Sequence, residues 1–208
     1  MAERRIIAVL LAAGLSLSGV SACAPRAQDP ASVAQADDMS LGDPKAKVQV
    51  VEYASASCPH CARWDMEVFP AFKAKYVDTG KVRYTLKEFL TEPEALAAAG
   101  FLLARCAGKD RYFPVLDAVF RGQEEMVATK DPKGVLQRIA ANPGGMSDAQ
   151  MEACLKDMNA EKALEARVER HEKVDKVTST PTFIINGRRI EGEMTLPELD
   201  AAIAKAAG

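Results

Sequence analysis

The sequence lacks the charge and the long apolar runs that would place it with nucleic-acid-binding or membrane-spanning proteins. Its 27 lysines and arginines are matched by 29 aspartates and glutamates, which gives a formal net charge of −2. This balance offers no electrostatic basis for binding nucleic acid. The long uncharged apolar run, residues 6–20, is about 15 residues long and too short for a comfortable membrane span.

Metal ligands are also scarce. The chain has five cysteines and two histidines, and Cys58 and Cys61 form its one C-x-x-C pair. A structural zinc site usually needs four ligands, commonly from two such pairs. We therefore predict no metal and no cofactor. A metal site at this pair remains an alternative, which stoichiometric metal in reduced protein purified under anaerobic conditions would favour.

The N-terminal residues have the pattern of an export signal. Arg4 and Arg5 form a short basic start before the apolar run at residues 6–20, as in a secretory signal peptide. The V-S-A-C motif that ends at Cys23 resembles a bacterial lipoprotein box. We predict a signal peptide at residues 1–22, lipidation of Cys23, and a periplasmic location on the cell envelope. Ordinary secretion without a lipid anchor is the alternative. In either case the protein is exported to a compartment where disulfides persist.

The remaining chain is expected to form a tether and one domain. Residues 23–41 are rich in alanine, proline, glutamine and aspartate without apolar periodicity, which predicts a flexible tether. Residues 42–207 number about 165, enough for a single domain with a full hydrophobic core. No internal repeat or second linker is visible, and we expect a monomer.

The first part of the domain reads as a βαβ unit. Residues 47–54 and 81–89 are rich in β-branched residues and predict two strands. Between them, residues 61–76 have apolar side chains on one helical face, with an expected kink at Pro70.

The rest of the domain reads as helices followed by a ββα unit. Residues 93–176 are helical in pattern, with expected breaks at Gly108, Gly122, residues 142–145 and near Asp157. A strand at 182–186, an Asn-Gly hairpin turn, a return strand and a closing helix complete the chain.

The C-P-H-C motif at the start of a helix, the helical insertion and the T-S-T-P-T-F-I-I-N-G segment together resemble the thioredoxin superfamily. More closely, they are similar to the DsbA-like thiol:disulfide oxidoreductases. The resemblance covers residues 42–207 and implies an α/β thioredoxin-like fold that is interrupted by an all-helical insertion at about 93–176. It also implies an exported enzyme that exchanges disulfides with other proteins.

The residue types around the C-P-H-C motif favour redox chemistry independently of the resemblance. Cys58 falls at a helix N-terminus, where unpaired N–H groups and the helix dipole stabilise a thiolate. Pro59 suits the first helical turn, where its missing N–H is not needed. His60 would add positive charge near the sulfur when it is protonated, unless it is simply a solvated helix residue. Cys61, one turn later, is the expected resolving thiol.

The resemblance assigns roles to two further positions. In thioredoxin-like proteins an acid six residues before the first cysteine relays protons to the second thiol, and this position is Glu52. The alternative is an exposed glutamate at a strand end. Thr180-Pro181 resembles the cis-proline loop that faces the active cysteines and pairs with extended substrate; the alternative is an ordinary trans loop.

Four other charged residues are interpreted as exposed. Lys87 lies on the predicted strand beside Glu52, and His171 lies in a segment dense in charges of both signs. Arg188 and Arg189 follow the hairpin turn. None of the four is assigned a function.

The two remaining cysteines, Cys106 and Cys154, lie 48 residues apart in the helical block. If Cys58 pairs with Cys61, Cys106 and Cys154 are left to pair with each other in an oxidising compartment. We predict a structural disulfide, although two separate core cysteines remain possible. Closing a loop of this length would stabilise the fold by roughly 4 kcal/mol through the entropy of the unfolded chain.

Together these patterns predict a dithiol oxidant that introduces disulfides into reduced, exported proteins. By resemblance, its reoxidation partner is a DsbB-like membrane protein. A reductase, an isomerase and a non-catalytic adaptor whose disulfide is inert remain alternatives, because the sequence does not set the redox potential.

Overall fold

The structure is a computed structural model in which residues 34–208 are described. Residues 1–33 contain the predicted signal peptide, Cys23 and much of the predicted tether, and they lie outside the described residues. Within residues 34–208, no helix is both long and apolar enough to cross a bilayer.

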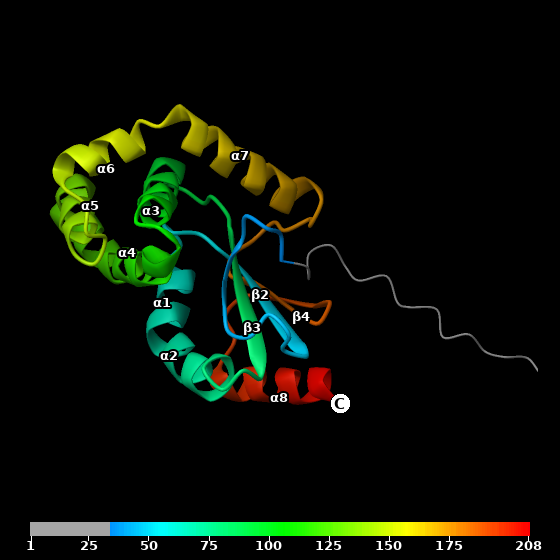
Figure 1. The fold of residues 1–208 in the computed structure, drawn as a ribbon. Helices are drawn as coiled ribbons and strands as arrows, with labels where there is room; N and C mark the ends of the chain where they lie inside the picture. The colour runs from blue at the N-terminus through cyan, green and yellow to red at the C-terminus, as the bar shows by residue number, and fades with distance from the viewer. Residues whose placement is uncertain (1–33) are drawn as a thin grey trace, which may run out of the picture.

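A five-stranded sheet forms the centre of the molecule, with the strand order β1-β3-β2-β4-β5 (Figure 1). Strands β2 and β3 are parallel, and the other neighbouring pairs are antiparallel. The strands are β1 (Met39–Leu41), β2 (Val48–Ala54), β3 (Val82–Glu88), β4 (Thr182–Ile185) and β5 (Arg188–Glu191). The predicted βαβ and ββα units are thus confirmed, and they meet in one sheet where β2 pairs with both β3 and β4.

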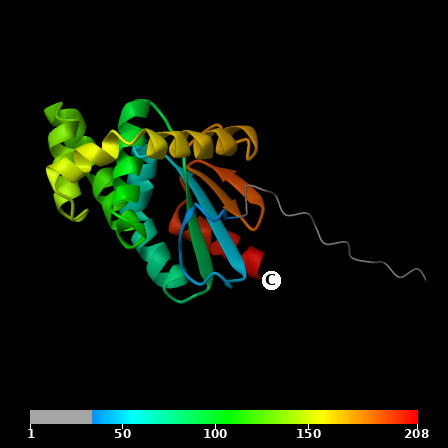
Figure 2. The same ribbon diagram turned by 45° about the horizontal axis from the view of Figure 1, so that its top comes forward.

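The two faces of the sheet are covered by different helices. Alternate residues of a strand point to opposite faces, so Glu52 and Tyr53 of β2 face different environments. Figure 2 shows helix α7 (Met158–Lys173) across one face and α8 (Leu196–Ala207) on the other. The α8 face also carries α1 (Pro59–Glu67), and Trp64 of this helix packs against aromatic rings of β3 and β4.

The helix after β2 breaks close to the position that Pro70 predicted. Helix α1 ends at Glu67, and α2 (Phe69–Phe72) begins two residues later with Pro70 in its first turn. A proline there lacks the N–H that would continue the α1 hydrogen-bond ladder. A short π-helix, η2 (Lys73–Val77), then leads to β3.

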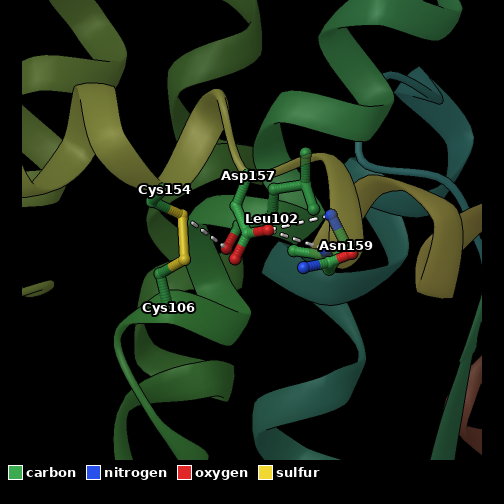
Figure 3. Close-up of a disulfide and its surroundings, with 6 residues drawn as sticks. Leu102, Cys106, Cys154, Asp157 and Asn159 are labelled. Atoms are coloured by element: carbon green, nitrogen blue, oxygen red, sulfur yellow. Dashed lines mark hydrogen bonds between the residues drawn. A yellow bond between two sulfur atoms is a disulfide. The ribbon is translucent and has the colours of Figure 1, made fainter.

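Most of the helical block lies beyond one end of the sheet, only α7 crosses a face of the sheet, and a disulfide joins two helices of the block. It contains α3 (Glu94–Cys106), α4 (Lys109–Thr129), α5 (Pro132–Ala141), α6 (Asp148–Leu155) and α7. Cys106 at the end of α3 is bonded to Cys154 on α6, with their Cα atoms 6.2 Å apart (Figure 3). Asp157 lies beside this bond and caps α7 by accepting from the Asn159 N–H at 2.8 Å.

One predicted break within the block is wrong. Helix α4 continues through Gly122, and the chain turns instead at Lys130, which has a positive φ of 57°. Gly122 is a packing residue, because a Cβ there would lie 3.0 Å from Cγ1 of Val135 on α5. Its missing side chain lets α4 and α5 approach closely, which the sequence pattern alone does not distinguish from a helix break.

The predicted tether extends too far into the domain. Residues 39–41 were assigned to the tether, yet they form β1 and pair antiparallel with β3, Met39 opposite Leu86. The preceding Asp37 accepts a hydrogen bond from Arg170 of α7 at 3.3 Å. A three-residue strand is too short to show the alternating pattern that predicts a strand from sequence. Strand β1 is held in place by its pairing with β3.

The interpretation of Lys87 and His171 as exposed is also wrong. Both side chains are fully buried, on the sheet face that α7 covers. Lys87 forms an ion pair with Asp175 at 3.0 Å, and the Nδ1–H of His171 donates to the Glu88 carbonyl at 2.7 Å. Burial lowers the pKa of His171 to about 4, so its imidazole is neutral at pH 7. Of the charged residues around His171 in sequence, Glu169, Glu172 and Lys173 are exposed, whereas Arg167 is buried like His171 itself.

The arginines after the hairpin differ from each other. Arg188 is exposed as expected. Arg189 is half-buried and donates to the backbone carbonyls of Asp175 and Lys176, the latter at 2.8 Å. It therefore ties the hairpin to the end of α7.

A buried carboxylate connects the helical block to the sheet. Glu88, the last residue of β3, accepts from Arg105 at 2.6 Å, from Arg167 at 2.7 Å and from the Tyr112 hydroxyl at 3.0 Å. These three partners come from α3, α7 and α4. A buried charge is tolerated when it is paired and hydrogen-bonded in this way. The network holds α3, α4 and α7 against the end of β3, which lies beside the end of β2.

Candidate active site

The two cysteines of the C-P-H-C motif lie where β2 meets α1. Cys58 is the N-cap of α1, with extended backbone angles, and its sulfur accepts from the Cys61 N–H at 3.4 Å. Both are free thiols in the structure. Cys58 is 6% exposed and Cys61 is 0% exposed, so the first sulfur is the one that another molecule can reach.

The two sulfurs differ strongly in acidity. A hydrogen bond from the Cys61 thiol, with further help from the backbone N–H groups of Cys61 and His60, lowers the pKa of Cys58 to about 5 despite its partial burial. Burial raises the pKa of Cys61 well above its usual value, and the neighbouring Cys58 charge raises it further. At pH 7 the pair therefore consists of a thiolate at Cys58 and a thiol at Cys61.

Hydrogen bonds with small hydroxyl side chains fix the loop before Cys58. The Cys58 N–H donates to the Ser55 carbonyl at 3.0 Å. The Ser57 hydroxyl donates to the Thr91 carbonyl at 2.8 Å, and the Thr91 N–H donates to Ser55 Oγ at 3.1 Å. The loop after β3 thus holds the loop after β2.

The helical block holds the same loop from the other side. Buried Gln123 of α4 donates from Nε2 to the carbonyls of Ala56 at 2.8 Å and of Cys58 at 3.3 Å. On α3, a Cβ at Gly100 would lie only 2.8 Å from the Ala56 Cβ. The glycine lets α3 approach the loop, and the glutamine gives the buried Ala56 carbonyl a partner. The Cys58 carbonyl also accepts from the Ala62 N–H within α1.

The Thr180-Pro181 segment faces Cys58. Its peptide bond is cis, and the Cys58 sulfur lies 3.5 Å from the Thr180 carbonyl oxygen. Thr180 Oγ1 is buried, and a hydrogen bond between the Thr180 side chain and Cys58 helps to lower the pKa of that thiol. The structure therefore brings the segment and the first cysteine together. The use of the segment for substrate binding remains a proposal.

Glu52 is buried beneath the pair and is 2% exposed, in contrast to the exposed alternative. Burial raises its pKa to about 8, and the nearby acidic groups of Asp65 and Cys58 raise it further. The hydroxyl of Tyr84, on the adjacent β3 strand, donates to its carboxyl group. Glu52 also lies close enough to Cys61 for its charge to raise the pKa of that thiol. A protonated carboxyl group is thus available at neutral pH near the buried sulfur.

His60 is exposed and its ring contacts Glu193, in the loop between β5 and α8. Arg63 of α1 donates to the same carboxylate, from Nε to Oε2 at 2.9 Å. Hydrogen bonds from Arg63 and then from His60 lower the pKa of Glu193 to about 2. The positive charge of Arg63 near the motif is therefore paired with a carboxylate, which the sequence interpretation of His60 did not include.

Four residues of the site were missed by the sequence analysis. Tyr84 was detectable in principle, because a parallel pairing of β2 and β3 places it on the Glu52 face. Gln123, Arg63 and Glu193 come from an amphipathic helix, an exposed helix turn and a loop. Their patterns are shared by many solvated residues, so the sequence carried no distinguishing signal for them.

The fold and the site together define a thioredoxin-fold protein with a dithiol at a helix N-terminus. A family model described as thioredoxin matches residues 34–205. The chain belongs to this family, and the helical insertion gives it the architecture of the DsbA type.

Comparisons with individual proteins agree with this assignment. A Rickettsia bellii protein named "Putative protein-disulfide oxidoreductase" is 33% identical over 170 residues, which are 82% of this chain and 64% of that protein. The chain thus spans less than two thirds of that relative. The crystal structure of Wolbachia pipientis alpha-DsbA1 has a TM-score of 0.77 and 27% identity, covering 84% of this chain and 92% of the other. Bacillus subtilis BdbD shares the fold at a TM-score of 0.70.

The acidity of Cys58 is directly testable. In the reduced protein, thiolate absorbance should titrate with a midpoint near 5. Because the folded pKa lies below the unfolded value, the thiolate should also stabilise the reduced fold above the unfolded pKa, and this stabilisation should be lost as pH falls through 5. Ultraviolet titration of the wild type against Cys58→Ser checks the midpoint, and denaturant unfolding of both reduced proteins at several pH values checks the stability. A midpoint near 9, the ordinary thiol value, would contradict the description of the site.

Proposed function

We propose that this chain is an exported thiol:disulfide oxidoreductase that acts as a dithiol oxidant through Cys58 and Cys61. The observation that carries the proposal is the low pKa of Cys58 beside the high pKa of Cys61. A stabilised thiolate favours the reduced form, which makes the corresponding disulfide a stronger oxidant. The names of the Rickettsia relative and of the Wolbachia neighbour support the same class of reaction.

The proposed reaction is a two-step thiol–disulfide exchange. A thiolate of a reduced protein attacks Cys58 Sγ of the Cys58–Cys61 disulfide. A mixed disulfide forms at Cys58, and Cys61 leaves and takes up a proton. A second substrate thiolate then attacks the substrate sulfur of the mixed disulfide, and Cys58 leaves as a thiolate. Two electrons pass from substrate to enzyme, and a DsbB-like membrane partner is proposed to remove them again.

The asymmetry of the site suits each leaving group. Cys58 leaves easily because its thiolate is stable, and a leaving thiol of low pKa departs faster. Cys61 is a poor leaving group as a thiolate because it is buried. We propose that Glu52, which is protonated at neutral pH, supplies the proton that Cys61 needs, with Tyr84 holding its carboxyl group in place.

The cis-proline segment is proposed to hold the substrate chain during exchange. Thr180 lies beside the Cys58 sulfur, with its carbonyl oxygen 3.5 Å from that atom, and the Thr180-Pro181 bond is cis. An extended peptide that adds to exposed backbone gains affinity from main-chain hydrogen bonds and little sequence specificity. This property suits an enzyme that meets many unfolded substrates.

A reductase or isomerase role and a non-catalytic adaptor are the remaining candidates. The stable Cys58 thiolate favours the reduced form of the pair, so the couple tends to accept electrons from its substrate. This direction argues against a reductase. Among residues 34–208, no group of three or more histidine, cysteine, aspartate and glutamate residues is arranged to hold a metal ion. Cys58 and Cys61 are the free cysteines of that range, and a redox role uses both.

Export and lipidation at Cys23 are proposed from the sequence, because residues 1–33 lie outside the described chain. If Cys23 is lipidated, the protein should enter the detergent phase and incorporate a fatty-acid analogue, and Cys23→Ser should lose both properties. Unlabelled, water-soluble wild-type protein would argue against the anchor.

The proposed oxidant activity predicts a stoichiometric reaction. Oxidised protein mixed with an equal amount of a reduced two-cysteine peptide should give peptide disulfide and free Cys58 and Cys61, detected by alkylation and mass spectrometry. Cys58→Ser should abolish the reaction, and the Cys106–Cys154 bond should remain oxidised throughout. A peptide that stays reduced beside an oxidised Cys58–Cys61 pair would identify an inert disulfide and overturn the proposal.

The proton-donor role of Glu52 predicts a pH-dependent defect. Glu52→Gln keeps a partner for the Tyr84 hydroxyl but cannot donate an acidic proton, so attack on the oxidised enzyme should slow by at least about tenfold near pH 6. The difference should shrink as pH rises through 8, where wild-type Glu52 loses its proton. Stopped-flow rates from pH 5 to 8 measure it, with Glu67→Gln on the exposed end of α1 as control. Equal rates for the two variants would make Glu52 a structural residue.

A further inference from the structure

Three of the four residues between β5 and α8, Gly192 to Met194, contact both halves of the active site. The Gly192 N–H donates to the carbonyl of Pro181 at 2.8 Å. The Met194 carbonyl accepts from Trp64 Nε1 of α1 at 2.9 Å. Glu193 lies between them, so its backbone is fixed relative to the cis-proline segment on one side and to the active-site helix on the other.

The Glu193 side chain extends from this position onto the exposed face of α1. Its carboxylate contacts His60 Nδ1, and it accepts two hydrogen bonds from the Arg63 guanidinium. Arg63 also contacts His60 Nδ1 at 2.7 Å. The three side chains form one cluster in the first turns of the helix that Cys58 caps.

The charge on Arg63 reaches the reactive sulfur. The pKa of Arg63 is raised first by its hydrogen bond and charge interaction with Glu193, and also by the charge of Cys58. The same guanidinium therefore interacts with three negative groups: the carboxylate of Glu193, which it contacts directly, and the more weakly felt charges of Glu67 and of the Cys58 thiolate. An opposite charge that is already paired stabilises a second anion less, because the net charge of the pair is near zero.

We propose that Glu193 is a positioning residue that limits the oxidising strength of the Cys58–Cys61 couple, by pairing with Arg63 and so reducing the positive charge available to the Cys58 thiolate. This inference rests on the proposed function, because it concerns the redox potential of the same couple. It assigns the exposed loop before α8 a role in setting that potential, separate from the buried contacts of the sulfur.

The inference predicts the sign of each charge removal. Without the Glu193 carboxylate, Arg63 is left unpaired near the sulfur, the thiolate is stabilised and the couple becomes more oxidising. Without the Arg63 guanidinium, the carboxylate is left unpaired and the couple becomes less oxidising. Removing both should return the couple toward the wild type. Because the cluster is exposed and screened by water, each single change should alter the equilibrium constant by only about two- to fivefold.

The test is the equilibrium of the couple with glutathione, measured for Glu193→Gln, Arg63→Gln and the double variant. Glu191→Gln is the matched control, since Glu191 is an exposed glutamate at the end of β5 and loses the same charge. Glu193→Gln should shift the constant toward reduced protein and lower the Cys58 titration midpoint, and Glu191→Gln should shift it less. Raising the salt concentration should shrink the Glu193→Gln effect.

Two results would overturn the inference while leaving the proposed function intact. One is an active couple whose constant is the same in Glu193→Gln and Glu191→Gln, with both variants folded by circular dichroism. The other is a shift of the same sign in Glu193→Gln and Arg63→Gln, which would indicate a general disturbance of the loop. If Glu193→Gln does not fold, Arg63→Gln alone decides, since an unchanged or more oxidising couple contradicts the charge argument. A wild-type couple that glutathione cannot reduce would instead overturn the proposed function.

Discussion

The interaction on which the rest of this structure depends is the one between the Cys58 sulfur and the first turn of α1. A helix leaves its first N–H groups without partners inside the helix, and an anion at that position satisfies them. Here the anion is the sulfur itself, which accepts from the Cys61 N–H. The buried Cys61 thiol below it keeps its proton, so two chemically identical side chains differ widely in acidity.

The surrounding structure maintains this difference by holding a short loop from several directions. Gln123 on α4 and the close approach of α3 at Gly100 connect the loop to the helical block. Glu88 binds that block to the end of β3 through buried ion pairs. Leaving any one of these polar groups buried without its partner would cost about 1–3 kcal/mol, which is large against the net stability of a domain. The helical insertion is thus a structural support of the site.

Local signals in the sequence predicted the parts of the molecule that depend on neighbouring residues. The β-branched run at 47–54, the C-P-H-C motif and the Asn-Gly turn each reflect short-range preferences, and they located the sheet, Cys58 and the cis-proline segment. Lys87 and His171 were misread because their burial depends on contacts between the end of β3 and the C-terminal end of α7, whose partners lie 83 to 88 positions apart in the sequence. Glu193 gave no signal for the same reason, since its partners lie 130 or more residues away.

The relative stability of the reduced and oxidised proteins tests the central claim most directly. Denaturant unfolding at pH 7 can be measured for both forms of the Cys58–Cys61 pair, with Cys106–Cys154 kept oxidised in each. An ordinary structural disulfide stabilises a protein by constraining its unfolded chain. If the Cys58 thiolate is stabilised as the structure indicates, the reduced protein should unfold at the higher denaturant concentration. A more stable oxidised protein would contradict the account.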